Sequence, residues 1–335
     1  MIRVGVIGYG YWGPNVVRNF GDLPNCQVIS VCDKNPGALE RLGGSQSTRV
    51  TSDAREVYAA SDVDAVAIVT PVSTHYELAR NALENGKHVF VEKPFTANSK
   101  QAEELIELAD SKNLQIMVDH TFLFTGAVRK LKDLVDEGTF GRLLYYDSMR
   151  VNLGLFQHDV NVVWDLAPHD LSIMDHLIDE KPVAVAATGE SHFGSLEDLA
   201  YITIFFGNRM IAHVNVNWLS PVKVRTTLIG GEKRMAVWND LDADEKVKVY
   251  DKGVVIDDDQ DQEGVYNLLV SYRSGDMYAP KVEQTEALKL EAQYFLDCIC
   301  SGDAPINDGW AGLRVVRLLE AASESLKDRG RLVEL

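Results

Sequence analysis

The spacing of glycines near the N-terminus is the feature that most constrains the fold. A short apolar run, Val-Gly-Val-Ile, leads into Gly-Tyr-Gly-Tyr-Trp-Gly and then into a segment that can form a helix. In a strand–turn–helix unit, Gly8 allows a tight bend, Gly10 lets the backbone approach a pyrophosphate, and Gly13 lets the helix pack closely. The sequence therefore predicts a dinucleotide-binding turn, with Tyr11 and Trp12 beside the cofactor.

An acidic residue follows the second apolar run. Asp33 directly follows residues 27–32. Its separation from the glycine turn is about that at which an acid accepts hydrogen bonds from the adenosine ribose of a dinucleotide. A carboxylate at this place repels the additional phosphate of NADP. We therefore expect NAD as the cofactor, although Lys34 and Arg41 leave the use of NADP open.

Composition favours a globular protein of two domains and argues against polyanionic partners. The chain has 335 residues, of which 46% are hydrophobic and 25% charged, with a formal net charge of −17. This charge opposes binding to nucleic acid or to an anionic membrane. The sequence shows neither a basic leader followed by an apolar segment nor a membrane-length apolar run, so a cytoplasmic location is expected.

Metal sites and disulfides are not predicted. The four cysteines lack the paired CxxC spacing of a zinc site, and a disulfide framework is not expected in a chain of this size. The acidic run at residues 257–261 lacks the spaced ligands and glycine of a calcium loop, so a solvated loop is expected there.

The first third of the chain alternates β-branched runs with helical stretches, the pattern of a doubly wound parallel sheet. Strands are expected at residues 3–8, 27–33, 65–70, 88–92 and 114–119. Helices are expected at residues 13–20, 74–84 and 99–111, with Ser99 as a helix N-cap. We interpret residues 1–119 as a Rossmann domain that binds NAD.

The rhythm changes after residue 119, where successive strands separated by turns predict an α+β domain with an open, mostly antiparallel sheet. Strands are expected at residues 143–151, 183–191, 199–206, 210–218, 223–229, 234–238 and 246–250. We assign residues 120–335 to this second domain, which would bind the substrate and mediate oligomerisation. Helices within about residues 285–329 are expected to pack back on the first domain.

Several polar residues follow the ends of the predicted parallel strands, where ligands bind in doubly wound sheets. The candidates for contact with the cofactor are Thr70, Pro71, His75, Glu92, Lys93 and His120. For His75 and His120, a capping or packing role is left open beside the cofactor role.

Three motifs together with the glycine turn carry a family resemblance. Thr70-Pro71 before His75, then Glu92-Lys93-Pro94, and then Asp165-Leu-Ala-Pro-His169 follow that turn in order. With them, nearly the whole chain resembles the glucose–fructose oxidoreductase, inositol dehydrogenase and rhizopine-catabolism (Gfo/Idh/MocA) family. The resemblance implies that Lys93, Asp165 and His169 flank the site of hydride transfer. It also implies that the second domain's sheet makes the subunit contact, so a homodimer or homotetramer is expected.

These residue types suit the oxidation of a secondary alcohol. A base must take the hydroxyl proton while the carbon gives its hydride to a nicotinamide. His169 is the leading candidate for this base, and Asp165, one turn earlier if the segment is helical, can fix its tautomer. The ammonium of Lys93 can stabilise the developing alkoxide. The choice of base between His169 and Lys93 is left open, because a desolvated lysine can also accept a proton.

The stretch from Arg150-Val-Asn-Leu-Gly154 through Trp164 to Asp170 is similar to the branch of the family that acts on nucleotide-linked amino sugars. This similarity implies a NAD-dependent dehydrogenase acting at C3 of a UDP-N-acetylhexosamine or its uronate. The candidate substrate-binding residues are Lys93, Arg150, Asn152, Asp165, His169 and Asp170. Two alternatives remain: a dehydrogenase of a free sugar or polyol such as inositol, and a non-catalytic sensor that only binds the dinucleotide.

Overall fold

The chain divides into two units, each described here by itself. The computed structural model describes residues 1–42, 48–154, 156–256 and 270–335. The first unit comprises Met1–Thr125 and Thr285–Glu320, and the second comprises Gly126–Gln284 and Ala321–Leu335. Residues 120–125, which the sequence analysis placed in the second domain, thus belong to the first unit. The acidic run at 257–261 lies outside the described residues.

The first unit is built on a parallel sheet, as predicted. Within the described ranges this sheet has six strands in the order β3-β2-β1-β4-β5-β6, and every neighbouring pair is parallel. The strands are β1 (Ile2–Ile7), β2 (Cys26–Cys32), β3 (Arg49–Thr51), β4 (Ala65–Ile68), β5 (His88–Glu92) and β6 (Ile116–Asp119). Strand β3 was not predicted, because its three residues are too short and too exposed to leave a hydrophobic pattern.

Helices and short 3₁₀ segments connect these strands. They are α1 (Gly13–Gly21), α2 (Pro36–Leu39), η1 (Glu40–Leu42), α3 (Arg55–Tyr58), η2 (Val72–Thr74), α4 (His75–Glu84), α5 (Ser99–Lys112) and η3 (Thr121–Phe124). The predicted cap of α5 was wrong by one residue: Asn98 is the N-cap, and its side-chain oxygen accepts a hydrogen bond from the backbone N–H of Gln101 at 3.0 Å. Ser99 is instead the first helical residue.

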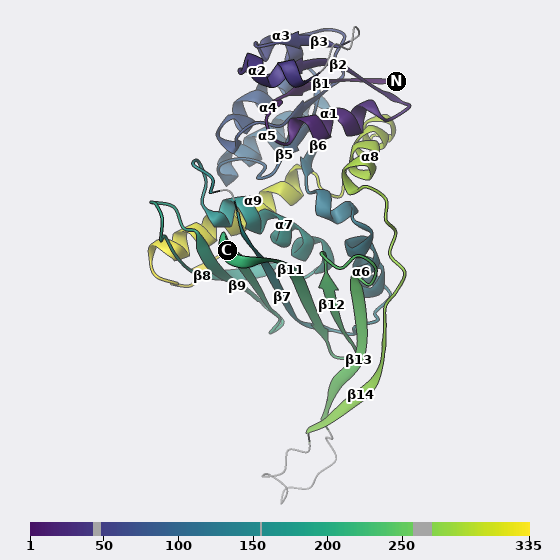
Figure 1. Cartoon of the computed structure of the whole chain (residues 1–335), viewed down its shortest axis with the longest axis vertical. Coiled ribbons are helices and arrows are strands. Elements are labelled where there is room, and N and C mark those ends of the chain that lie inside the picture. The colour runs from purple at the N-terminus through teal and green to yellow at the C-terminus, as the bar shows by residue number, and fades with distance from the viewer. Residues whose placement is uncertain (43–47, 155, 257–269) are drawn as a thin grey trace, which may run out of the picture. The chain divides into compact units, whose positions relative to one another are not determined.

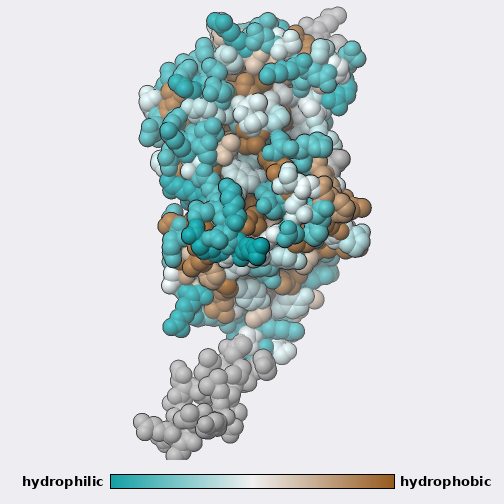
Figure 2. Space-filling model, turned by 90° about the vertical axis from the view of Figure 1, so that its left-hand side faces the viewer, coloured by the Kyte–Doolittle hydropathy of each residue, from teal (hydrophilic) through white to brown (hydrophobic). Residues whose placement is uncertain are grey.

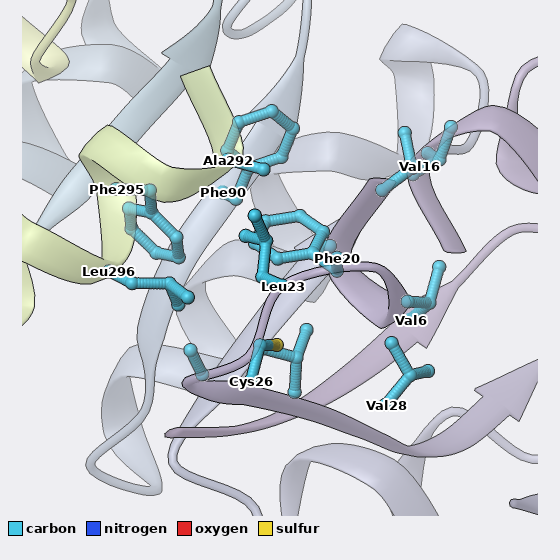
Figure 3. Packing of buried hydrophobic residues seen from close by; sticks show 14 of the residues in the cluster. Val6, Val16, Phe20, Leu23, Cys26, Val28, Phe90, Ala292, Phe295 and Leu296 are labelled. Carbon is cyan, nitrogen blue, oxygen red and sulfur yellow. The ribbon is translucent and has the colours of Figure 1, made fainter. Parts of the chain in front are cut away.

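A late helix completes the core of the first unit. Helix α8 (Ala287–Ser301) contributes Phe295 to a cluster with Phe20 of α1 and Phe90 of β5 (Figure 3). The ring centroids of Phe20 and Phe90 lie 5.5 Å apart in an edge-to-face arrangement, and Phe295 lies 5.7 Å from Phe90. These buried rings fix α8 against the sheet that carries the glycine turn.

The second unit is built on a mixed sheet. Within the described ranges it has nine strands in the order β14-β13-β12-β11-β7-β10-β9-β8-β15. Figure 1 labels β7, β8, β9 and β11 to β14 of this sheet. The strands are β7 (Leu143–Leu153), β8 (Pro182–Glu190), β9 (Leu199–Phe206), β10 (Ile211–Asn217), β11 (Leu219–Gly231), β12 (Met235–Asn239), β13 (Val247–Ile256), β14 (Val270–Tyr278) and β15 (Val333–Glu334). Among the described strand pairs of this sheet, only β7–β10 is parallel, so the predicted mostly antiparallel sheet is confirmed.

Strands β14 and β15 were not predicted. The two residues of β15 pair with β8, and no hydrophobic pattern distinguishes so short a strand. The helices of this unit are α6 (Gly126–Asp136) and α7 (Val162–Leu177), and α9 (Gly309–Lys327) contributes residues to both units. Helix α7 packs against β7, β9 and β10, which places its buried face on the centre of the sheet.

The surface is mixed in polarity. On the face in Figure 2, hydrophilic residues in teal alternate with smaller brown hydrophobic areas. None of the helices in the described ranges combines the length and apolar character needed to cross a bilayer.

The four cysteine thiols are free, and burial raises the pKa of Cys26 to about 12 and that of Cys32 to about 11.

Candidate functional site

The glycine turn has the geometry that a dinucleotide site requires. Gly8 has φ +103°, and a Cβ there would lie 2.1 Å from the backbone oxygen of Val69. A Cβ on Gly13 would lie 2.4 Å from the carbonyl oxygen of Gly8, so α1 can start this close only with glycine. Around Gly10 no described atom lies within 4 Å of the Cβ position. The backbone at Gly10 is therefore open to a ligand, and the turn fits a bound pyrophosphate.

Two charged side chains flank this turn. Asp33 follows β2, and one of its carboxylate oxygens accepts a hydrogen bond from the backbone N–H of Tyr9 at 2.6 Å. The guanidinium of Arg41 donates to the carbonyl oxygen of Tyr9 at 2.9 Å and to that of Gly10 at 3.3 Å. An anionic and a cationic group thus both lie at the place where the sequence predicts the adenosine ribose.

The two aromatic side chains of the turn, Tyr11 and Trp12, have different surroundings. Tyr11 is 89% exposed, whereas the indole N–H of Trp12 donates to Asp119 at the end of β6 at 3.3 Å. Trp12 therefore connects the glycine turn to the carboxyl end of a strand three places away in the sheet.

His75 ties two of the predicted cofactor segments together. Its Nδ1 lies 2.9 Å from the carbonyl oxygen of Pro94 and its Nε2 lies 2.7 Å from that of Thr70. Burial lowers the pKa of His75 more than these carbonyls raise it, so the neutral ring donates to one of them. The side-chain oxygens of Thr70 and Thr74 are 2.7 Å apart, which closes the turn that contains Pro71. This geometry favours the packing role for His75.

Glu92, Lys93 and His120 lie at the carboxyl ends of β5 and β6. Glu92 and Asp119 are register partners on these strands. The His120 ring is buried, and burial together with the charges of Arg314 and Lys93 lowers its pKa to about 3. His120 is therefore neutral near pH 7, and the ammonium of Lys93 lies close enough to oppose its protonation.

Asp165 and His169 are brought onto one face of α7. The helix begins after Asn161, whose side-chain oxygen accepts from the backbone N–H of Trp164 at 3.1 Å. Asp165 lies in the first turn and His169 four residues later, a spacing that aligns two side chains on a helix. Both are half-buried. One Asp165 oxygen accepts a hydrogen bond from the indole of Trp218 at 3.2 Å.

Two of the predicted substrate residues are paired with each other. Arg150 on β7 donates to both carboxylate oxygens of Asp170, at 2.6 and 3.2 Å, and both side chains are at most 5% exposed. This geometry favours a structural role for Arg150 and Asp170 over direct contact with a substrate. Asn152, two residues along β7, lies on the same side of the sheet and is half-buried.

A cavity of about 910 Å³ lies in the second unit. Its wall includes an aromatic group in which the ring of Phe156 lies 6.0 Å from Phe193 and 5.4 Å from Trp218. Trp218 thus contributes to the cavity wall while its N–H binds Asp165. His192, also in the wall, lies 2.7 Å from the buried Asp198. The cavity therefore adjoins the segment that carries Asp165.

Sequence reasoning did not identify Trp218, Asp119 or the cavity residues Phe156 and Phe193 as site residues. It also missed Glu291 of α8, which accepts a hydrogen bond from the amide of Asn307 at 2.9 Å, although Glu291 carried a signal. Leu288, Ala292 and Phe295 define the buried face of α8, and Glu291 is a charged residue at the same helical spacing. Among the residues that the structure describes, no group of three or more histidine, cysteine or acidic side chains is placed to hold a metal ion.

Lys93 belongs to the first unit, and Asp165 and His169 belong to the second. Their meeting at one cofactor stays a prediction.

Comparisons with known proteins cover most of the chain. Residues 2–120 match the family model described as an oxidoreductase family with an NAD-binding Rossmann fold, and residues 128–237 match that of the GFO/IDH/MocA C-terminal domain. An uncharacterised oxidoreductase of Streptococcus pneumoniae is 26% identical, and the match spans 63% of this chain and 61% of that protein.

Two relatives with named activities match over nearly their whole lengths. The UDP-N-acetylglucosamine 3-dehydrogenase of Acidithiobacillus ferrooxidans is 27% identical over 94% of both chains. Its solved structure superposes with a TM-score of 0.80 at 25% identity, covering 98% of both chains. The inositol 2-dehydrogenase of Rhizobium meliloti is 23% identical over 99% of this chain and 98% of that one. The chain belongs to the GFO/IDH/MocA oxidoreductase family, with an NAD-binding Rossmann domain.

Proposed function

We propose that this protein is an NAD-dependent dehydrogenase that oxidises a secondary ring hydroxyl of a nucleotide-linked sugar, at C3 of a UDP-N-acetylhexosamine or its uronate. The observation that carries the proposal is the alignment of Asp165 and His169 on α7, with Asp165 held by a tryptophan of the adjoining cavity. The match to the A. ferrooxidans 3-dehydrogenase over 94% of both chains supports this substrate class.

The glycine turn and Asp33 would hold the cofactor. NAD, when bound, supplies the acceptor for the hydride that leaves the alcohol carbon. The open backbone at Gly10 and the start of α1 would bind the pyrophosphate, and Asp33 would accept hydrogen bonds from the ribose.

We assign the transfer of the hydroxyl proton and the stabilisation of the resulting charge to side chains of the two units. His169 would accept the hydroxyl proton through its imidazole, and Asp165 would orient that ring from one turn earlier. Lys93 would donate a hydrogen bond to the oxygen as negative charge develops on it. The pH dependence of kcat/KM distinguishes His169 from Lys93 as the base.

The aromatic cavity supports a substrate with a planar base. Rings of Phe156 and Phe193 offer faces on which a nucleobase can stack, and Gln157 and Ser195 in the same wall offer polar groups for its edge. A base stacked on an aromatic side chain contributes about 1–3 kcal/mol. We infer that the uracil of the substrate occupies this cavity while the sugar extends toward Asp165.

Removing one stacking ring should weaken substrate binding without slowing the chemistry. We expect Phe193→Ala to raise the KM for UDP-N-acetylglucosamine about tenfold, from about 1.4 kcal/mol of lost stacking, with kcat within about twofold. Initial rates of NADH formation over a range of sugar concentrations measure both constants. UDP alone, added with NAD, should also raise the melting temperature of the native protein.

Leu241→Ala is the matched control, since this exposed apolar residue lies outside the cavity wall. It should leave KM unchanged. An unchanged KM in Phe193→Ala would reject the uracil assignment, and indifference of the melting temperature to every UDP-sugar would reject a nucleotide-linked substrate.

The cofactor preference depends on the charge of Asp33. We expect Asp33→Ala to weaken NAD binding about tenfold and NADP binding less, because the carboxylate that repels the additional phosphate is removed while Arg41 remains nearby. Titration of each cofactor by calorimetry gives both dissociation constants.

Asp33→Asn separates the charge from the turn geometry. The two Asp33 oxygens accept from the N–H groups of Tyr9 and Asn35 at 2.6 and 2.8 Å, and the single amide oxygen of asparagine keeps one of these bonds. Asp33→Asn should therefore shift preference toward NADP with a smaller general loss of affinity than Asp33→Ala. An equal loss of NAD and NADP affinity in Asp33→Ala would remove the reason for preferring NAD.

A second candidate function is oxidation of a free polyol, favoured by the match to an inositol 2-dehydrogenase over 99% of this chain. In that case free inositol would be turned over and Phe193→Ala would leave its KM unchanged.

A homodimer or homotetramer formed through the second unit's sheet, and a cytoplasmic location, stay predictions. Light scattering of the purified protein measures the first.

A further inference from the structure

Three carboxyl groups meet inside the first unit, and we call Glu92, Asp119 and Glu291 the acid cluster. Glu92 and Asp119 end neighbouring strands in register, and Glu291 approaches from α8. Asp119 is 2% exposed and Glu291 is fully buried. Asp119 interacts with both of the other side chains.

The hydrogen-bond donors around the acid cluster do not satisfy every oxygen. Asp119 accepts from the indole of Trp12 at 3.3 Å and from the hydroxyl and the N–H of Thr121. Glu291 Oε1 accepts from the amide of Asn307 at 2.9 Å. Glu291 Oε2 is buried, and none of the described residues gives it a donor. Two ionised carboxylates in contact cannot hydrogen-bond each other, because both only accept.

A proton on Glu291 resolves this arrangement. Burial, followed by the charge of Asp119, raises the pKa of Glu291 well above its usual range. Burial and Asp119 also raise the pKa of Glu92, where the ammonium of Lys93 acts in the opposite direction. A buried acid with neighbouring carboxylates favours its neutral form, and a protonated carboxyl can donate.

The surrounding charges favour the proton on Glu291 over Glu92. The ammonium of Lys93 favours the ionised form of Glu92, although burial and Asp119 outweigh it. The charges named beside Glu291 are the carboxylates of Asp119 and Glu92, and both oppose its ionisation. Metal binding is not favoured, because no described group of such side chains is placed to hold an ion.

We propose that Glu291 is a neutral acid whose carboxyl O–H donates a hydrogen bond to Asp119 and thereby holds Asp119 in place to accept the indole N–H of Trp12. Glu291 is then a positioning residue for the cofactor. It fixes Asp119, Asp119 fixes Trp12, and Trp12 belongs to the turn in which Gly10 is open to the pyrophosphate. This inference rests on the NAD-binding fold and is independent of the sugar that the protein oxidises.

The protonation state can be read directly by infrared spectroscopy. The spectrum of the native protein minus that of Glu291→Gln at pH 7 should contain the carbonyl stretch of a protonated carboxylic acid. If that difference instead contains only the stretches of an ionised carboxylate, Glu291 carries no proton and the proposal fails. Glu92→Gln is the matched variant within the same cluster, because the pKa of Glu92 is also raised. If the protonated stretch disappears in Glu92→Gln and persists in Glu291→Gln, the proton belongs to Glu92 and the proposal fails.

The affinity for NADH tests whether Glu291 positions Asp119 and Trp12. Glutamine can still donate to Asp119, so Glu291→Gln should keep the dissociation constant of NADH within about threefold of the native value. Glu291→Met has similar size without a donor, and it should raise that constant about tenfold. Trp12→Phe removes the indole N–H together with its five-membered ring, and a similar or larger loss is expected, which keeps the test available if the methionine variant does not fold. Equal affinities in the glutamine and methionine variants would overturn the positioning role.

The pH dependence gives a further readout that a purely structural contact would not change. Because the pKa of Glu291 is raised, its proton is present below that pKa and lost above it, when Asp119 and Glu291 repel each other. NADH affinity of the native protein should therefore fall on the alkaline side, and Glu291→Gln should remove this fall. A native profile unchanged by Glu291→Gln would contradict the coupling between the proton and Trp12.

Discussion

Replacement of His169 by asparagine should lower kcat/KM for the sugar by about 10²- to 10⁴-fold, the usual contribution of a positioned general base. Asparagine keeps polar atoms on the same face of α7, so the free energy of unfolding should change little. The affinity for NADH should stay within about twofold of the native value, because His169 belongs to the second unit and the glycine turn to the first. Steady-state rates and fluorescence titration of NADH measure these quantities.

The control is His176→Asn, two helical turns further along α7. Burial lowers the pKa of His176, so it is a comparable neutral imidazole on the same helix, and its loss should leave kcat within about twofold. The pH profile identifies the base. If His169 takes the proton, kcat/KM of the native protein falls as the imidazole becomes protonated, and this acidic limb disappears in His169→Asn. A limb that persists there but disappears in Lys93→Met would assign the proton to Lys93.

The fold was predictable where the sequence pattern was long enough to be periodic. Five of the parallel strands and the mixed second sheet follow from β-branched runs and turn residues, and the cofactor turn follows from Gly8 and Gly13, whose Cβ positions are blocked by backbone. Strands β3 and β15 were not predictable, because three and two residues carry no period. Their pairing is decided by neighbours that lie far away in the sequence.

The candidate site was predictable only as a set of residue types. Asp165 and His169 lie on one face of α7, because residues four apart in an α-helix are neighbours on its surface. The partners of each side chain were not predictable. Nothing in the sequence indicates that Trp218 binds Asp165 or that Asp119 meets Glu291, because these contacts join segments separated by 53 and 172 residues.

The pairing of Arg150 with Asp170 leads to the largest expected change in stability. We expect Asp170→Asn to lower the free energy of unfolding by about 3–5 kcal/mol, because it leaves the buried guanidinium of Arg150 without its carboxylate. Arg225 is the register partner of Arg150 on β11, and after burial the charge of Arg150 is the main cause that lowers its pKa. Loss of Asp170 would thus remove the carboxylate that offsets the repulsion between Arg150 and Arg225, while Arg225 keeps Asp240 at 3.3 Å. Urea denaturation followed by near-ultraviolet circular dichroism measures the effect.

The double variant Arg150→Met with Asp170→Leu separates a structural pair from a substrate contact. Replacing both charges by apolar side chains of similar size removes the uncompensated charge, and it should restore most of the stability that Asp170→Asn loses. If the pair only supports the fold, KM for the UDP-sugar should recover together with stability. If the double variant is stable but its KM stays raised tenfold or more, Arg150 binds the diphosphate of the substrate. The burial of its guanidinium would then be a property of the protein without that ligand.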